Sequence, residues 1–136
     1  MRNLFLLVAM IHSMSLLAQT PHHPTIENHD LARGISLSDF RFSWKLQATN
    51  RSDLQAFYQI QLGEVGVDGK PGEKKIWDSG KVKSEQSNWV MYAGPKLQPA
   101  KTYWWRVRYW LVGGTQSRWS SENQFSTGLM GNEAWS

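Results

Sequence analysis

The feature that most constrains the fold is segment 102–112, which reads TYWWRVRYWLV. Aromatic and β-branched residues at this density favour a strand over a helix, and Pro99 and Gly113 delimit the segment. Alternate side chains of a strand point to opposite faces. One face is almost wholly apolar and belongs in a core: Tyr103, Trp105, Val107, Tyr109 and Leu111. The other alternates aromatic and cationic side chains: Trp104, Arg106, Arg108 and Trp110. A strand this long and this apolar on one face predicts a β-sandwich.

The aromatic and cationic face allows three uses. A guanidinium group over an indole ring is worth about 0.5–1 kcal/mol when exposed, so the face can form a cation–π ladder that also includes Arg118. It can instead contact a neighbouring domain, or present open rings as platforms for a sugar. Rings sandwiched between guanidinium groups indicate the ladder, which we favour, and open rings indicate a platform. The candidate interface or sugar-contact residues are therefore Trp104, Arg106, Arg108 and Trp110.

Other segments repeat the alternation of apolar and polar residues. The predicted strands are 39–46, 56–62, 75–78, 87–92 and 116–127, with a short edge strand near Thr25. The glycine- and lysine-rich segment 63–75 predicts a loop, and Gly113 and Gly114 predict a tight hairpin. About seven short strands and no helix of ordinary length predict an all-β sandwich. Its expected core is Trp44, Tyr58, Ile60, Tyr103, Trp105 and Val107.

The first residues have the pattern of a secretory signal peptide. Arg2 precedes a mostly apolar run from Leu4 to Leu17, and Ala18 offers a cleavage site. The run is too short and too interrupted for a membrane anchor. We therefore expect residues 1–18 to be a signal peptide, residues 19–23 a flexible leader, and the mature protein to be exported, periplasmic or extracellular. The chain has no cysteine, so its stability cannot come from disulfides.

Composition excludes several functions of the mature chain. Removal of 18 residues from 136 leaves 118, enough for one domain, and 14 basic residues then stand against 11 acidic ones, a net charge of +3. The basic residues are spread along the chain, so we expect no nucleic-acid partner, and no membrane contact after signal cleavage. His22, His23 and His29 lack the spacing of a metal site, and no cofactor is expected. The carboxylates are scattered, Asp78 capping a turn, so no catalytic pair is expected.

Two sets of residues carry resemblances to known families. Leu97, Pro99 and Tyr103 resemble the fibronectin type III and immunoglobulin-like pattern, in which a tyrosine occupies a corner before a core strand, and Trp44 matches the core tryptophan. A narrower resemblance covers nearly the whole mature chain. Its motifs are RFSW at 41–44, WDSGKV at 77–82, YAG at 92–94, YWWRVR at 103–108, SRWS at 117–120 and FSTGL at 125–129. Together they resemble the N-terminal fibronectin-like domain of bacterial α-L-rhamnosidases.

The rhamnosidase resemblance implies a role and a domain organisation. It implies that residues 24–128 are a non-catalytic accessory domain of a secreted glycosidase, and that 129–136 begin a linker to a catalytic domain that this chain lacks. The implied partner is that catalytic domain, with rhamnose-containing glycans as a second candidate. The alternative is a stand-alone carbohydrate-binding module that uses exposed tryptophans. We expect no catalysis by this chain alone.

Overall fold

The computed structural model describes residues 19–29, 32–47 and 53–129. Within these ranges the chain is all-β, and no helix that could cross a membrane is found there. The strands are β1 (His22–Ile26), β2 (Ala32–Ile35), β3 (Arg41–Lys45), β4 (Gln55–Val65), β5 (Pro71–Asp78), β6 (Val82–Lys83), β7 (Val90–Met91), β8 (Thr102–Leu111) and β9 (Asn123–Thr127). The predicted signal peptide, and all of the predicted linker except Leu129, lie outside the described residues.

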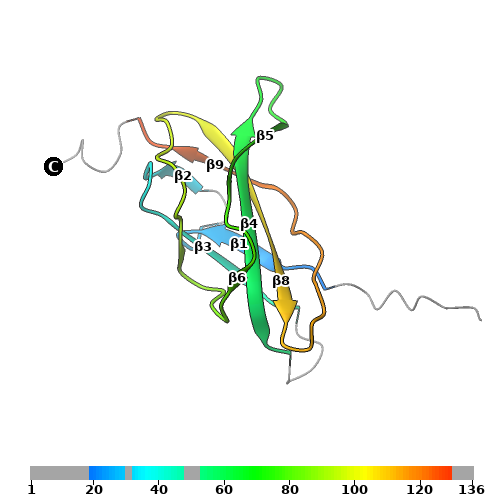
Figure 1. Cartoon of the computed structure of the whole chain (residues 1–136). Helices are drawn as coiled ribbons and strands as arrows, with labels where there is room; N and C mark the ends of the chain where they lie inside the picture. The colour runs from blue at the N-terminus through cyan, green and yellow to red at the C-terminus, as the bar shows by residue number, and fades with distance from the viewer. Residues whose placement is uncertain (1–18, 30–31, 48–52, 130–136) are drawn as a thin grey trace, which may run out of the picture.

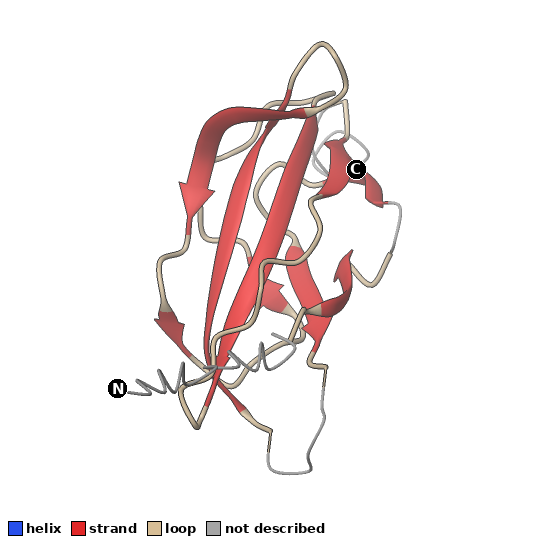
Figure 2. Cartoon of the chain, turned by 90° about the vertical axis from the view of Figure 1, so that its right-hand side faces the viewer, coloured by secondary structure: helices blue, strands red, loops and turns tan. Residues whose placement is uncertain are grey.

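The strands form two sheets that pack face to face as a sandwich (Figures 1 and 2). The smaller sheet has the order β1-β3-β7, and the larger has the order β2-β9-β8-β4-β5 with β6 also paired to β4. All pairs are antiparallel except β2 with β9, which is parallel. The architecture is that of the immunoglobulin and fibronectin type III sandwich, as predicted.

Strands β4 and β8 form the long central pair of the larger sheet (Figure 1). Their register places Ile60 opposite Val107 and Leu62 opposite Trp105 on the inner face. The same register places Gln59 opposite Arg108 and Gln61 opposite Arg106 on the outer face. One continuous pairing thus positions both the core and the aromatic and cationic face predicted from the sequence.

The core between the sheets is built mainly from aromatic rings. The Phe42 and Trp105 ring centroids lie 4.7 Å apart, and Phe40 stacks on Tyr92 at 4.6 Å. Of the six predicted core residues, five are buried: Trp44, Ile60, Tyr103, Trp105 and Val107. The sixth, Tyr58, is half-buried at the edge of this cluster, where its ring meets the edge of Trp44.

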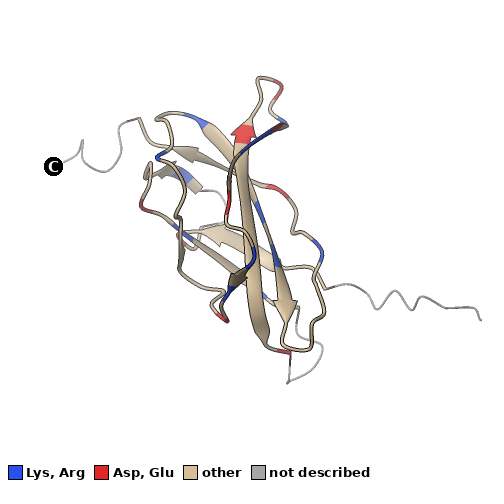
Figure 3. Cartoon of the chain, viewed as in Figure 1, with Lys and Arg blue, Asp and Glu red and all other residues tan. Residues whose placement is uncertain are grey.

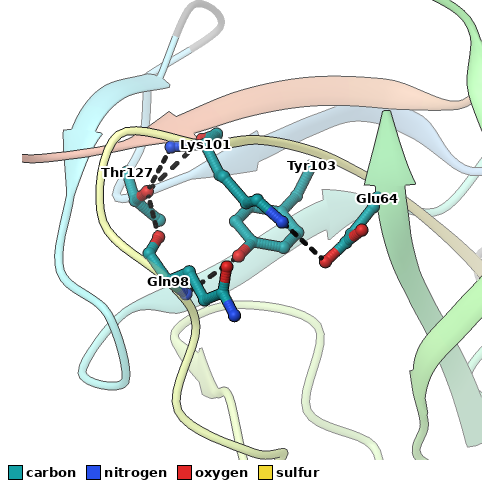
Figure 4. A network of polar contacts seen from close by, with 5 residues as sticks. All are labelled: Glu64, Gln98, Lys101, Tyr103 and Thr127. Atoms are coloured by element: carbon teal, nitrogen blue, oxygen red, sulfur yellow. Dashed lines mark hydrogen bonds and ion pairs between the residues drawn. The ribbon is translucent and has the colours of Figure 1, made fainter. Parts of the chain in front are cut away.

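Tyr103 forms the tyrosine corner that the sequence predicted. Its hydroxyl oxygen accepts a hydrogen bond from the backbone N–H of Gln98 at 2.9 Å (Figure 4). The Thr127 hydroxyl donates to the Gln98 carbonyl at 2.6 Å and accepts from the Lys101 N–H at 3.0 Å. An ion pair between Lys101 and Glu64 at 3.2 Å joins the corner to β4. These contacts fix the direction in which the chain enters β8.

The predicted loop over 63–75 is mostly a hairpin. Strand β4 continues to Val65, and β5 begins at Pro71. Between them the Gly66 N–H donates to the Lys70 carbonyl, and Asp68 accepts from the Lys70 N–H. The pair Asp68-Gly69 is the sequence signal of this turn, which the high content of glycine and lysine obscured.

The predicted last strand over 116–127 is regular only in β9, from Asn123 to Thr127. The preceding segment follows β8 through serine hydroxyls. The Tyr109 N–H donates to the Ser117 hydroxyl, and the Val107 N–H donates to the Ser120 hydroxyl. In return, the N–H groups of both serines donate to the carbonyls of the same β8 residues. Serine side-chain oxygens thus take the place of the backbone carbonyls that a regular neighbouring strand would offer to β8. The alternation of apolar and polar residues in the sequence cannot predict this substitution.

The leader predicted at 19–23 is attached to the fold, contrary to expectation. Gln19 is buried, and its amide oxygen accepts a 2.6 Å hydrogen bond from the Tyr109 hydroxyl. Strand β1 already begins at His22. Strand β2 was not predicted, and the strand expected over 87–92 is limited to β7. Val90 in β7 and Tyr92 just after it are buried in the core.

We expect replacement of Trp105 by alanine to cost about 3–5 kcal/mol, because the ring is 1% exposed and fills the centre of the core. A domain of this size has only about 5–15 kcal/mol of stability. Urea unfolding followed by fluorescence measures the loss. Val112→Ala is the matched control, since Val112 is 68% exposed. An unchanged midpoint for Trp105→Ala would show that this ring is not a core residue.

Candidate functional site

The outer face of the larger sheet carries the predicted cation–π ladder. Its centre is the Trp119 ring, which has the Arg106 and Arg108 guanidinium carbons 4.3 Å from its centroid. Arg106 also lies 5.8 Å from the Trp104 ring, and Arg108 lies 5.2 Å from the Trp110 ring. The structure therefore brings all four candidate residues together. It adds Trp119, which the sequence placed in the last strand, whereas Arg118 is exposed and makes no cation–π contact among the described residues.

Lys81 extends the ladder at the Trp110 end. Its ammonium group lies 4.5 Å from the Phe57 ring centroid and 4.7 Å from that of Trp110. Phe57 stands opposite Trp110 in the register of β4 and β8. The single aromatic on the polar face of β4 is thus the cross-strand partner of an outer tryptophan.

A second layer of polar contacts orients the two arginines. Gln61 accepts from two nitrogens of Arg106 at 2.6 and 2.9 Å, and Gln59 accepts from Nε of Arg108 at 2.9 Å. Both glutamines donate their amide nitrogens to the Asp78 carboxylate, at 2.9 and 2.8 Å. Each glutamine therefore bridges a cation to one carboxylate, and each amide can point in only one direction.

Asp78 is the anionic end of this network. Partial burial would raise the pKa of its carboxyl group, but hydrogen bonds from Gln59, Gln61 and the Gly80 N–H, with the charge of Lys75, outweigh burial and lower it. The Gly80 contact is the predicted turn cap. Elsewhere basic and acidic residues are spread over the molecule rather than gathered in one patch (Figure 3).

Trp104 is the candidate residue whose environment differs most from an open sugar platform. It is only 3% exposed although it belongs to the outer face. Its ring lies over Gly63, where a Cβ atom would stand 2.5 Å from the indole nitrogen. Nearby the Gln124 amide, next to Trp104 in register, donates to the Gly69 carbonyl in the β4–β5 turn. The tertiary fold therefore covers this ring.

The geometry of the outer face indicates what it can do. Its indole rings are either buried, as in Trp104, or covered by cations, as in Trp110 and Trp119. Among the described residues no group of histidine and acidic side chains could hold a metal ion. Among the described residues, the buried indole N–H of Trp104 has no hydrogen-bond partner. The face is otherwise a closed layer whose arginines and glutamines are paired with one another, which suits a structural role or contact with another domain. The position of Gln59 and Gln61 on the same face of β4 as Phe57 was the sequence signal for its second layer, whereas nothing local indicated Trp119 or Lys81.

We expect Gly63→Ala to destabilise the protein by about 1–3 kcal/mol, because the new methyl group would overlap the buried Trp104 ring. Gly113→Ala is the matched control, since a Cβ there meets no atom within 4 Å. Thermal unfolding of both variants measures the difference. Equal midpoints would show that the Trp104 ring is free to move away from Gly63.

We also expect the contribution of Asp78 to stability to depend on pH. Because its pKa is lowered in the folded protein, the carboxylate stabilises the fold above the unfolded-state pKa of about 3.9, and the contribution is lost as pH falls through the folded-state pKa. Urea unfolding of wild type and Asp78→Asn at pH 7 and pH 3 measures this. The gap between the two proteins should narrow at pH 3, and a constant gap would contradict the expectation.

Comparison with known proteins is consistent with this geometry. A family profile described as "Rha78A-like, N-terminal immunoglobulin domain" matches residues 21–131. The α-L-rhamnosidase of Streptomyces avermitilis is 35% identical over 113 residues, which are 83% of this chain and 11% of the relative. An α-L-rhamnosidase of Formosa agariphila is 30% identical over 131 residues, 96% of this chain and 14% of the relative.

Solved structures show the same relationship. The crystal structure of the Streptomyces avermitilis α-L-rhamnosidase complexed with L-rhamnose matches with a TM-score of 0.73 and 36% identity, over 88% of this chain and 11% of that one. The structure of α-L-rhamnosidase from Dictyoglumus thermophilum matches with a TM-score of 0.70 and 31% identity, over 85% of this chain and 13% of that one.

These matches are confined to one small part of much longer enzymes. The chain spans 11–14% of the length of the two curated relatives described above. Those relatives carry the domain in the same polypeptide as a glycosidase catalytic domain, and the match does not include that catalytic domain. The predicted resemblance is therefore confirmed, and the chain belongs to the family of Rha78A-like N-terminal immunoglobulin domains.

Proposed function

We propose that this chain is a non-catalytic accessory domain that packs beside the catalytic domain of a glycosidase or positions it. The observation that carries the proposal is the closed outer face of the larger sheet. A face whose rings are covered by its own cations, and whose cations are held by Gln59, Gln61 and Asp78, is rigid. A rigid face of this kind suits a spacer or a docking element better than a reactive site.

The family supports the same proposal. The relatives named above are α-L-rhamnosidases, and each holds the matching domain as a small fraction of its length. We infer that the catalytic domain of such an enzyme is the partner, joined in the same polypeptide. The apolar run at 4–17 supports export of this chain, as expected from its sequence.

The geometry of the ladder does not support the alternative function, a stand-alone module that binds carbohydrate. A pyranose ring stacks on an open indole face, and Trp104 and Trp110 do not offer one. We therefore do not assign carbohydrate binding to Trp104, Arg106, Arg108 or Trp110.

A domain graft tests the accessory role. In the Streptomyces avermitilis α-L-rhamnosidase, the segment that matches this chain is either deleted or replaced by residues 21–131 of this chain. We expect deletion to lower the thermal midpoint, and the graft to restore it with kcat on an aryl rhamnoside close to that of the parent enzyme. A graft carrying Trp105→Ala is the control for folding of the transplanted domain. A deletion that leaves both midpoint and kcat unchanged would contradict the proposal.

The isolated protein provides an independent readout. We expect no hydrolysis of an aryl rhamnoside by this chain alone, because the match does not include the catalytic domain of the relatives. Turnover that copurifies with the chain, and that is lost in a variant of one of its own carboxylates, would overturn the accessory role.

A further inference from the structure

A groove lined by both polar and apolar residues lies on the smaller sheet, away from the ladder. Its lining includes Thr25 from β1, Ser43 and Lys45 from β3, and Asn28, Ser87 and Asn88 from the adjoining turns. Ser43 and Lys45 are two residues apart on one strand, so their side chains leave the same face of the sheet. The larger sheet and its ladder contribute no residue to this lining.

Several of these side chains retain hydrogen-bonding capacity that the described residues do not use. The Thr25 and Ser87 hydroxyls, the Asn28 amide and the Lys45 ammonium make no side-chain hydrogen bond within the described part of the chain. Asn88 uses only its amide oxygen, which accepts from the Ser43 hydroxyl at 2.8 Å. The groove therefore combines hydroxyl, amide and ammonium groups, and no carboxylate is found among its described lining residues.

Trp89, which follows the groove-lining residue Asn88 in the chain, has a strained backbone conformation. Its φ is +57°, in the left-handed region that bulky residues avoid. Asn28 and His23, which line the groove, also have positive φ, at 61° and 48°. Such strain persists only where surrounding contacts fix the backbone, and it concentrates at functional sites.

The contacts that fix this backbone come from three side chains. The Trp89 N–H donates to the Ser43 hydroxyl at 3.0 Å, and Gln86 donates to the Trp89 carbonyl at 3.1 Å. Gln55 reaches from β4 and donates to the carbonyls of Ser84 and Gln86 at 3.1 and 2.8 Å. The loop is therefore anchored from both sheets, and the strained residue is held in place.

The result is an exposed aromatic ring beside polar groups. Trp89 is 39% exposed, and the Arg41 guanidinium carbon lies 5.3 Å from its ring centroid. Arg41 is itself oriented by Met91, whose sulfur accepts from Nε at 3.2 Å. Arg41, Ser43 and Lys45 share one face of β3, so the ring and the groove lie along one line of side chains.

We propose that this groove, together with the neighbouring Trp89 ring, binds an acidic oligosaccharide. One sugar ring places its C–H face on the side of the Trp89 indole that the Arg41 guanidinium does not cover, which is a rigid apolar surface with a polar edge. The hydroxyls of the next sugar exchange hydrogen bonds with Thr25, Asn28 and Asn88, which have unused donors or acceptors. Lys45 binds a uronate carboxylate by a charge-assisted hydrogen bond. The site is separate from the ladder, and the inference goes beyond the accessory role proposed above.

The chemistry of the groove favours this ligand over a protein partner. A protein contact of useful strength buries an apolar centre. Here the lining mixes hydroxyl, amide and ammonium groups with the apolar side chains of Trp44 and Leu46, so no purely apolar centre is present. A polyhydroxylated ligand satisfies such groups one by one, and the basic side chains select one that carries carboxylates.

The test is a titration of the purified full chain with trigalacturonate, with cellotriose as the neutral probe, followed by the indole N–H signals in NMR spectra at about 0.15 M salt, where long-range charge effects are screened. We expect trigalacturonate to shift the Trp89 signal and to leave those of Trp104 and Trp119 unmoved. Cellotriose should bind about tenfold more weakly, because it lacks the carboxylate that Lys45 would bind.

Three variants make the test specific. Trp89→Gly should weaken trigalacturonate binding by about tenfold or more, since it removes the ring. It should also unfold at the same or a higher denaturant concentration, because glycine adopts the left-handed conformation without strain. Lys45→Gln should reduce trigalacturonate affinity to about that for cellotriose. Lys74→Gln is the charge-matched control, on an exposed position of β5 in the other sheet, and should bind like wild type.

Three results would overturn the proposal. The first is no shift of the Trp89 signal with either sugar. The second is equal affinity of wild type, Lys45→Gln and Lys74→Gln for trigalacturonate, which indicates attraction to overall charge alone. The third is a dimer in sedimentation that Trp89→Gly dissociates, which assigns the exposed ring to protein contact. None of these results bears on the graft experiment, so the two proposals fail independently.

Discussion

The structure depends on the antiparallel pairing of β4 with β8. This pairing puts Leu62 opposite Trp105 on one face and Gln61 opposite Arg106 on the other. A shift of one residue would exchange the two faces and send arginines into the core, so burial of the aromatic rings holds the register. The core and the ladder are therefore two consequences of a single alignment.

The two outer faces of the sandwich use polar residues in opposite ways. On the larger sheet nearly every polar group has a partner: Arg106 binds Gln61, Gln61 binds Asp78, and Trp119 lies between two guanidinium groups. On the smaller sheet, groups such as the Thr25 hydroxyl and the Lys45 ammonium have no side-chain partner within the described residues. A satisfied layer adds rigidity, whereas unused hydrogen-bonding groups beside an exposed ring are suited to a ligand.

The strained backbone at Trp89 lowers the stability of the fold, which indicates that the tryptophan side chain serves another purpose. Its left-handed conformation costs free energy that the contacts of Ser43, Gln86 and Gln55 offset. A glycine would remove that cost, so the tryptophan is better explained by what its ring contacts than by what it adds to the fold.

The sequence by itself determined the fold class, the facing of β8 and the tyrosine corner at Tyr103, because strand alternation and corner chemistry are local properties of the chain. The ordered series of motifs from 41–44 to 125–129, with those at 77–82 and 103–108 the most specific, indicated the family. Only the tertiary structure decided which outer rings are covered. Trp104 is buried because Gly63, forty-one positions earlier in the chain, leaves room for its ring, and Trp119 joins the ladder because Ser117 and Ser120 bind the β8 backbone. The conformation of Trp89 likewise depends on Ser43 and Gln55 in other strands. Contacts between residues distant in sequence leave no periodic pattern, so they could not be predicted from it.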